Sequence, residues 1–386
     1  MHPKFPWTKV ILYLTYNDQP SGVYWSQVTD VVAHLNTLGG PQVRLVALVS
    51  ARDYFGIRRK IRAHSPYAWV LPMVPQMKRW RSNAILVKTV CRLLRPSGMI
   101  ARGALAAWMA LRARDKGLLK KVCFDARGAY AAEWEEYRII DDDALIAQFR
   151  EVEQEVLDRS DLRIAVSNAL VEHWRERYSY AQQEHVVIPC TLGRAHYWEP
   201  SAVEARREAL GFVPKDVVLV YSGSTAGWQS FALLEGLLRP VLEAQPRTKV
   251  LFLCPPDPAI DKLAKDHLGR VLTTWMPPAE VPAVLQACDV ALLVREDTIT
   301  NRVASPTKFA EYLACGLPVI ISESIGDFSS VVNEHGLGIV HAEGGMLPVL
   351  NRPNAEERVR CRDHAREHFT KEAHNAAYRK VMEVLA

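Results

Sequence analysis

The sequence predicts an α/β protein built from two doubly wound parallel sheets, and three observations predict this fold class. Short apolar runs alternate with helical patterns along the whole chain, which is typical of strand–helix–strand units. The alternation restarts after Pro189, and 386 residues are more than one hydrophobic core usually supports. Apolar residues make up 49% and charged residues 24%, which is the composition of a folded globular protein.

The first half of the chain is expected to contain seven strands with helices between them. The first helix shows an apolar face at three-and-four spacing, formed by Trp25, Val28, Val31, Val32, Leu35 and Leu38. The expected strands cover residues 9–15, 43–49, 68–72, 99–102, 121–125, 162–167 and 186–189.

The second half repeats this pattern and is expected to form a second sheet. Its expected strands cover residues 217–221, 249–253, 290–294, 319–321 and 338–340. The boundary falls near residues 191–200, where Gly193 and Pro200 interrupt regular structure. We therefore expect domains at residues 1–195 and 196–370, with a last helix at 371–386 that packs back on the first domain. The sheets should face each other across a cleft, and ligands of such sheets bind at the carboxyl ends of the strands.

Charge is distributed unevenly between the two halves. Residues 1–124 hold 20 Lys and Arg against 4 Asp and Glu, whereas the rest of the chain is acidic. A basic half indicates an anionic partner: a lipid surface, a phosphate-bearing substrate or nucleic acid. Nucleic acid is disfavoured because no helix-turn-helix, RNA-recognition or zinc-finger pattern accompanies the charge. The basic residues form three clusters, at 58–62, 78–81 and 112–116, and Trp80 among them would suit a membrane interface.

The cysteines and the apolar runs indicate a cytoplasmic protein. Seven cysteines are scattered with no C-x-x-C pair, so we expect reduced thiols, with neither a disulfide framework nor a zinc site. No signal peptide is recognisable, and no apolar run reaches the roughly 18 residues that a membrane span needs. Docking of the basic half on the cytosolic face of a membrane remains open.

The most informative segment is 305–320, which reads Ser-Pro-Thr-Lys-Phe-Ala-Glu-Tyr-Leu-Ala-Cys-Gly-Leu-Pro-Val-Ile. Ser305 is a good N-cap and Pro306 suits the first helical position, while Gly316 ends the helix before the next strand. The segment therefore predicts a short helix whose amino-terminus points out of the sheet.

That helix tip carries residue types that suit a nucleoside diphosphate. Free N–H groups at Thr307 and the positive charge of Lys308 favour a diphosphate at the first turn. Glu311 lies on the same face and can accept hydrogen bonds from both ribose hydroxyls. The alternative is that Lys308 and Glu311 form only an ion pair at i,i+3 spacing on the helix surface.

The whole segment resembles the donor site of glycosyltransferase family 4. Supporting likenesses are Asp289-Val290-Ala291-Leu292-Leu293, Ile188-Pro189-Cys190 and Tyr221-Ser222-Gly223-Ser224. The resemblance implies the GT-B fold, a nucleotide-sugar donor, retention of anomeric configuration and no metal or other cofactor. It also implies donor contacts at Gly223, Ser224 and Thr225, and it implies catalytic roles for Lys308 and Glu311.

Two departures from the family pattern affect the donor site. Members often carry two Glu eight residues apart, and Val303 stands at the first of these positions. Many members hold the diphosphate with an Arg and a Lys after the first strand of the second domain, but residues 224–229 contain neither. The nearest cations that can replace them are Lys308, Arg302 and Arg295, in that order.

The first half contributes two arginines at expected strand ends. Ala-Arg-Gly occurs at Arg102 and at Arg127, where each side chain would overlook the cleft and could hold a phosphate bidentately. The resemblance implies acceptor contacts at Arg102, Asp125, Arg127 and Glu133, with Arg127 in catalysis as well. Asp125 and Arg127 stabilising the turn is the alternative. Gly22 resembles the family's glycine loop, in which a missing Cβ lets the sugar and diphosphate approach.

Asp141-Asp142-Asp143 precedes an expected helix and follows no strand. Acidic residues favour a helix amino-terminus, so capping is preferred over a metal site here. The sequence thus predicts a transferase that moves a sugar to a glycan or lipid-linked acceptor in cell-surface polysaccharide assembly. A nucleotide-sugar epimerase or hydrolase, and a non-catalytic partner of an active transferase, are the alternatives.

Overall fold

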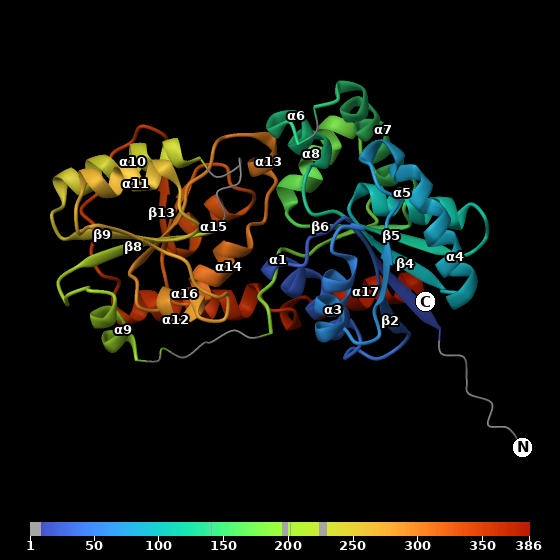
Figure 1. Cartoon of the computed structure of the whole chain (residues 1–386), viewed down its shortest axis with the longest axis horizontal. Coiled ribbons are helices and arrows are strands. Elements are labelled where there is room, and N and C mark those ends of the chain that lie inside the picture. Colours follow the sequence, from blue (N-terminus) through green and yellow to red (C-terminus); the bar gives the residue numbers. More distant parts are fainter. Residues whose placement is uncertain (1–8, 140, 195–199, 201, 224–229) are drawn as a thin grey trace, which may run out of the picture. The chain divides into compact units, whose positions relative to one another are not determined.

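The computed structural model describes residues 9–139, 141–194, 200, 202–223 and 230–386. Its internal contacts divide the chain into unit 1, Met1–Gly193 with His374–Ala386, and unit 2, Arg194–Ala373. Each unit contains one parallel sheet covered by helices (Figure 1). The two sheets confirm the α/β fold class that the sequence predicts.

The sheet of unit 1 has seven strands in the order β3-β2-β1-β4-β5-β6-β7, all of them paired in parallel. The order reverses between β1 and β4, and ligands of such sheets bind beside that reversal. All seven expected strands are present, with ends shifted by at most two residues. They are β1 (Val10–Tyr16), β2 (Gln42–Val49), β3 (Trp69–Pro72), β4 (Gly98–Arg102), β5 (Lys121–Asp125), β6 (Leu162–Ala165) and β7 (His185–Val187).

The helices of unit 1 include a π-helical turn in the first one, where the sequence predicts a single regular helix. The buried residues Val28, Val31, Val32 and Leu35 confirm the apolar face that predicts this helix. The elements are α1 (Gly22–Tyr24), η1 (Trp25–Thr29), α2 (Asp30–Leu35), α3 (Tyr54–His64), η2 (Met77–Asn83), α4 (Ala84–Leu94), α5 (Ala104–Arg114), α6 (Tyr130–Tyr137), α7 (Asp143–Arg159), α8 (Asn168–Tyr178) and, after unit 2, α17 (Asn375–Leu385).

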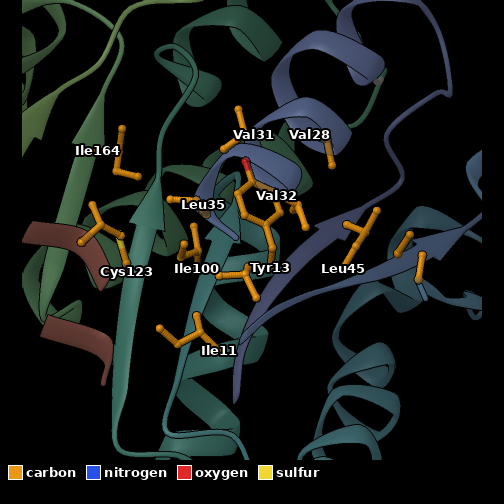
Figure 2. Close-up of a cluster of buried hydrophobic side chains, with 14 of the residues drawn as sticks. Ile11, Tyr13, Val28, Val31, Val32, Leu35, Leu45, Ile100, Cys123 and Ile164 are labelled. Carbon is orange, nitrogen blue, oxygen red and sulfur yellow. The ribbon is translucent and has the colours of Figure 1, made fainter. Parts of the chain in front are cut away.

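One hydrophobic cluster of unit 1 lies between the sheet and the first helix, with side chains from α3 and α17. Figure 2 shows Val31, Val32 and Leu35 facing side chains of the sheet, among them Tyr13 and Ile100. The last helix, α17, buries Leu385 in the same cluster. A Cβ on Gly98 would lie 2.8 Å from the Leu385 carbonyl oxygen, so this close approach requires glycine.

The sheet of unit 2 has six strands in the order β10-β9-β8-β11-β12-β13, again parallel. Here the order reverses between β8 and β11. The five expected strands are present, and the prediction missed β10 at the edge of the sheet. The strands are β8 (Val217–Ser222), β9 (Thr248–Leu253), β10 (Val271–Thr274), β11 (Val290–Leu293), β12 (Val319–Ser322) and β13 (Gly338–His341).

A buried carboxylate connects the helices of unit 2 to its sheet. Asp289 lies fully buried at the start of β11 and accepts hydrogen bonds from Arg207, Arg358 and the Val218 backbone N–H, at 2.9 to 3.0 Å. These bonds join three segments that are distant in sequence. The helices are α9 (Val203–Ala209), α10 (Phe231–Ala244), α11 (Pro258–Asp266), α12 (Val281–Leu285), α13 (Ile299–Arg302), α14 (Thr307–Ala314), α15 (Phe328–His335) and α16 (Ala355–His368), followed by η3 (Glu372–His374).

Candidate functional site

The helix expected from residue 305 onward is present as α14, but it starts later than predicted. Its N-cap is Pro306, with extended backbone at φ −62° and ψ 123°, and no side chain caps it. The prediction of Ser305 as N-cap and Pro306 as the first helical residue is therefore wrong, because the extended ψ of Pro306 places the proline outside the helix. Ser305 is buried, and the first helical residue is Thr307.

The end of α14 agrees with its prediction. Gly316 has a φ of +75°, in the left-handed region that glycine adopts at low cost, and its N–H donates to the Leu313 carbonyl. The helix therefore runs from the carboxyl edge of the sheet to β12, with its amino-terminus at the edge where β8 and β11 end.

Lys308 and Glu311 lie on the same face of α14, as the sequence predicts. The Lys308 Nζ lies 2.6 Å from the Glu311 Oε2, and about a third of each side chain or less is exposed. The ion pair therefore forms without a ligand, as the alternative of a surface ion pair between Lys308 and Glu311 predicts. Both side chains also remain accessible to a ligand at the tip of the helix.

Tyr312 is a residue that the sequence analysis missed. Its hydroxyl accepts a hydrogen bond from the Ser222 N–H at 2.9 Å and donates one to the Ser222 carbonyl at 3.2 Å. Burial raises the pKa of Tyr312, so the phenol stays neutral. This contact fixes α14 to the end of β8, next to Gly223. A tyrosine amid the apolar residues that follow Glu311 is the sequence signal that could have indicated this role.

The two other candidate cations in unit 2 are held by neighbouring residues. The exposed Arg302 forms a two-pronged ion pair with Asp297, at 2.6 and 2.7 Å. Arg295 is buried, and its Nη1 donates to the Asn301 side chain at 3.3 Å. Of the three cations expected near the diphosphate, only Lys308 belongs to α14.

Arg295 faces a pocket beside α10 that the sequence did not predict. The pocket encloses about 650 Å³ and is bounded by one side of α10, the ends of β11 and β12, and the segment 342–347. Asp297, Glu323 and Glu343 also line it, whereas the described lining residues include none from 305–311. Arg295 therefore lines a pocket whose described lining does not include Lys308, and the role of Arg295 at the diphosphate stays a prediction.

The glycines and hydroxyl residues of the expected donor site are placed in part. Gly223 follows β8, and its N–H donates to the Leu253 carbonyl at 3.3 Å. Ser224 and Thr225 lie outside the described residues. Val303 is buried, so the position of the family's first Glu presents an apolar side chain to the interior. A Cβ on Gly22 would meet no described atom within 4 Å, so the packing of unit 1 does not itself require glycine there.

The strand ends of unit 1 carry a buried cluster of charged and phenolic side chains. Asp125, fully buried at the end of β5, accepts a hydrogen bond of 2.5 Å from the Tyr13 hydroxyl. The Arg127 Nε lies 2.9 Å from one Asp125 oxygen, and its Nη2 donates to the other at 3.2 Å. Arg127 is thus committed to Asp125, which is the turn-stabilising geometry of the alternative interpretation.

Arg102, at the end of β4, lies in the same cluster but is held more loosely. Its Nε is 3.8 Å from Asp18 and its Nη1 is 3.9 Å from Asp125. Burial raises the pKa of Asp18, a residue just after β1 that the sequence analysis missed. Glu133, on α6, is partly buried, and burial followed by its neighbour Glu136 raises its pKa. The position of Asp18 after a central strand is the signal that could have identified it.

The structure changes the expectation for the basic clusters of unit 1. Trp80 is buried and packs edge-to-face against Trp108, so its expected place at a membrane interface is wrong. The side chains of Arg112 and Arg114 form ion pairs with acidic residues of the same unit. The basic side chains of 58–62 on α3 and of 78–81 on η2 are exposed or half-buried, and Lys78 among them pairs with Asp142. No described helix is long and apolar enough to cross a membrane.

The acidic run at 141–143 caps a helix, as predicted. The Asp142 side chain accepts from the Leu145 N–H at 3.1 Å and pairs with Lys78. The described residues contain no group of three or more His, Cys, Asp or Glu placed to hold a metal ion. His364 and His368 have the i,i+4 spacing that the sequence analysis overlooked, with ring centroids 4.4 Å apart. Burial, then the neighbouring histidines, lower the pKa of His364 to about 4.

No protein-family model and no curated protein matches the chain. Solved structures do match. Sucrose-phosphate synthase from Thermosynechococcus elongatus superposes with a TM-score of 0.68 and 16% identity, over 98% of this chain and 99% of that one. Anabaena HepE, in complex with UDP, has a TM-score of 0.72 and 14% identity, over 97% and 99%. The chain has the GT-B fold.

A third similar structure is WaaG, a glycosyltransferase involved in lipopolysaccharide biosynthesis, with a TM-score of 0.57 and 13% identity over 97% of this chain and 95% of that one. The GT-B fold that the sequence resemblance implies is therefore confirmed, with both sheets matched. At these sequence identities the similarity establishes the fold alone.

Proposed function

We propose that this GT-B protein is a glycosyltransferase that moves a sugar from a nucleotide-sugar donor to a glycan or lipid-linked acceptor. We further propose retention of anomeric configuration, independence from metal, a role in cell-surface polysaccharide assembly and a cytoplasmic location. The sequence resemblance to family 4 supports these finer assignments.

One observation carries the proposal. The amino-terminus of α14 opens at the carboxyl edge of the unit 2 sheet, beside the reversal of strand order, with Lys308 in its first turn and Glu311 one turn further. That combination suits a diphosphate and a ribose together. Anabaena HepE, a structure with the same fold, is solved with UDP and with UDP-glucose.

The chemistry asks the protein for positioning and for charge stabilisation. The bond between the anomeric carbon of the sugar and the diphosphate oxygen breaks, and a bond from that carbon to an acceptor oxygen forms. Negative charge grows on the leaving diphosphate, where the α14 amino-terminus and Lys308 stabilise it. The proton of the acceptor hydroxyl leaves to the departing diphosphate.

Calorimetric titration with UDP and with other nucleoside diphosphates tests the donor site. K308A and E311A should each lose most of the affinity for the best ligand of the panel. D363A is the matched control, because it removes another i,i+3 ion pair of unit 2, Arg366–Asp363, from the exposed surface of α16. Affinity equal to wild type in both K308A and E311A would refute the site.

An epimerase or hydrolase is the second candidate. A Listeria monocytogenes protein assigned as a UDP-N-acetylglucosamine 2-epimerase, 12% identical, superposes with a TM-score of 0.54 over 96% of this chain and 90% of that one. Such an enzyme converts the donor without an acceptor. Incubation of the protein with nucleotide sugars alone distinguishes the two, because a transferase should give little turnover until acceptor is added. Tight donor binding with no turnover in a complete lysate would favour a non-catalytic partner, consistent with Val303.

We also propose that unit 1 contacts an anionic membrane surface. No acidic residue occurs from 54 to 114, and this stretch includes the basic surface of α3 and η2. Each basic residue near an anionic leaflet contributes about 1 kcal/mol. The protein should sediment with vesicles containing phosphatidylglycerol but not with pure phosphatidylcholine, and R58A/R59A/K60A should weaken this. Equal binding of the variant would contradict this contact.

A further inference from the structure

Arg102 is the one member of the buried cluster in unit 1 whose guanidinium lacks a firm partner among the described residues. Only 11% of its side chain is exposed, yet its two ion pairs are 3.8 and 3.9 Å long, beyond hydrogen-bond distance. Its Nη1 is buried without a hydrogen-bond partner in the described part of the chain. Its neighbour Arg127 also has buried nitrogens without a hydrogen bond, but its Nη2 donates to Asp125 at 3.2 Å and its Nε lies 2.9 Å from the other Asp125 oxygen.

A guanidinium in this state is costly unless something else satisfies it. It carries five N–H donors, and a buried charged donor without an acceptor loses the hydration that it has in the unfolded chain. Buried polar groups in proteins are otherwise almost always hydrogen-bonded. Asp125 is already engaged, because Tyr13 donates to one of its oxygens and the Arg127 Nε lies 2.9 Å from the other. The arrangement indicates an anion that approaches from outside the chain.

The helix that follows Arg102 adds a second, independent feature of an anion site. α5 has 11 residues, and it begins immediately after Gly103. The first N–H groups of a helix have no partner within the helix, and Gly103 has no side chain to accept from them. Gly103 has a φ of +81°, in the left-handed region that glycine adopts at low cost, and it is the one residue between Arg102 at the end of β4 and Ala104 at the start of α5. A helix amino-terminus favours phosphate in particular.

Asp18 offsets part of the positive charge beside Arg102. It lies after β1, on the other side of the reversal of strand order, and its carboxylate is the nearest competitor for the Arg102 Nε. A third of its side chain is exposed, so it can move or take up a proton when an anion arrives. An anion should therefore bind more tightly as Asp18 loses its charge.

We propose that Arg102 and the amino-terminus of α5 bind a phosphate group carried by the acceptor, so that the acceptor is a phosphorylated glycan or a lipid-linked sugar phosphate. This inference rests on the proposed transferase function, since it assigns the acceptor of that reaction. Arg127 is then a positioning residue, which holds Asp125 and thereby the wall of the site. Arg102 forms the bidentate contact that an arginine makes with phosphate.

Titration with inorganic pyrophosphate tests the proposal on the full chain. Wild-type protein should bind at two sites, one at α14 and one at Arg102. K308A should keep only the second site, and K308A/R102M should lose about 10- to 100-fold of the remaining affinity. R102K, which keeps the charge but loses the planar fork, should fall between. R112M is the matched control, because it removes an arginine at the far end of the same helix.

The variant D18N should change the pyrophosphate affinity in the opposite direction. Removing the competing carboxylate should raise pyrophosphate affinity at the Arg102 site several-fold, and it should flatten the rise in affinity that wild type shows as the pH falls. A purely structural ion pair between Arg102 and Asp18 would give no gain in D18N. Equal affinity in K308A and K308A/R102M would overturn the proposal. If R102M prevents folding, the absence of a gain in K308A/D18N over K308A overturns it instead.

The source of the phosphate is decided by competition. If the phosphate belongs to the acceptor, saturating UDP should leave the Arg102 site of wild type open to pyrophosphate, and a short-chain polyprenyl diphosphate should close it. Closure of the site by UDP would mean that the diphosphate of the donor reaches Arg102, and it would overturn the acceptor assignment. Undiminished UDP binding in K308A and E311A would instead refute the proposed donor site, and it would leave the Arg102 result standing.

Discussion

The buried carboxylate of Asp125 gives the most quantitative prediction for unit 1. Asp125→Asn keeps the size of the side chain but removes its charge, while the Arg127 guanidinium stays 8% exposed beside it. Removing one partner of a buried ion pair costs about 3–5 kcal/mol, because the other charge stays buried without compensation. The hydrogen bond from Tyr13 would weaken as well.

This cost is large enough to measure by thermal unfolding. For a domain of roughly 150–250 residues, each kcal/mol lowers the Tm by about 2–4 °C, so D125N should lower the Tm of unit 1 by about 6–20 °C. Circular dichroism or scanning calorimetry measures this shift. The matched variant D125N/R127M removes the uncompensated charge too, and it should recover half of the loss or more, because an apolar replacement of a buried pair can be near neutral.

Two results would refute this reasoning. The first is a Tm for D125N within about 2 °C of wild type, which would mean that solvent reaches the pair more easily than its burial implies. The second is a double variant no more stable than D125N, which would mean that the carboxylate contributes mainly through the Tyr13 hydrogen bond and not through the charge of Arg127.

Three further predictions concern other contacts of the fold. Burial raises the pKa of Glu153 to about 7 from its ordinary 4.5, so the folded chain holds this proton more tightly and stability should fall by up to about 3 kcal/mol as the pH rises from 4.5 to 7. E153Q should remove that slope in urea unfolding measured across this range; an unchanged slope would contradict it. L385A should cost about 2–5 kcal/mol, because it leaves a cavity over Gly98 between α17 and the sheet, and a loss below 1 kcal/mol would show that the helix is loosely packed. Y312F should lower stability by about 1–2 kcal/mol and weaken nucleotide binding, since α14 loses both hydrogen bonds to Ser222. A nucleotide affinity of Y312F equal to that of wild type would show that the Tyr312 hydroxyl does not support the donor site.

Much of the fold could be predicted because strands of a parallel sheet are buried on both faces. They therefore read as continuous apolar, often β-branched runs, as in Val217–Ser222. β10 was missed because it is an edge strand with the short sequence Val-Leu-Thr-Thr, of which only Val271 is buried. The capping role of Asp142 and the helix end at Gly316 were predictable because each depends on a few neighbouring residues.

The sequence could predict where the site residues lie on the strands, but not which side chains they pair with. The sequence places Asp125, Arg102 and Arg127 at strand ends, yet it cannot tell which arginine the buried carboxylate holds, because strand order decides that. The start of α14 was wrong by one residue, since the backbone of Pro306 is extended. Trp80 was misplaced because its partner Trp108 lies on a different helix. The pocket facing Arg295 depends on segment 342–347, which packs there only in the folded unit.

A crystal structure of the full chain with UDP would test the central claim most directly. We expect the diphosphate at the amino-terminus of α14 within reach of the Lys308 Nζ, and both ribose hydroxyls within hydrogen-bond distance of the Glu311 carboxylate, with the Lys308–Glu311 pair opened or shared. A nucleotide seated beside α10 against Arg295, with that ion pair intact, would contradict the donor site proposed for this protein.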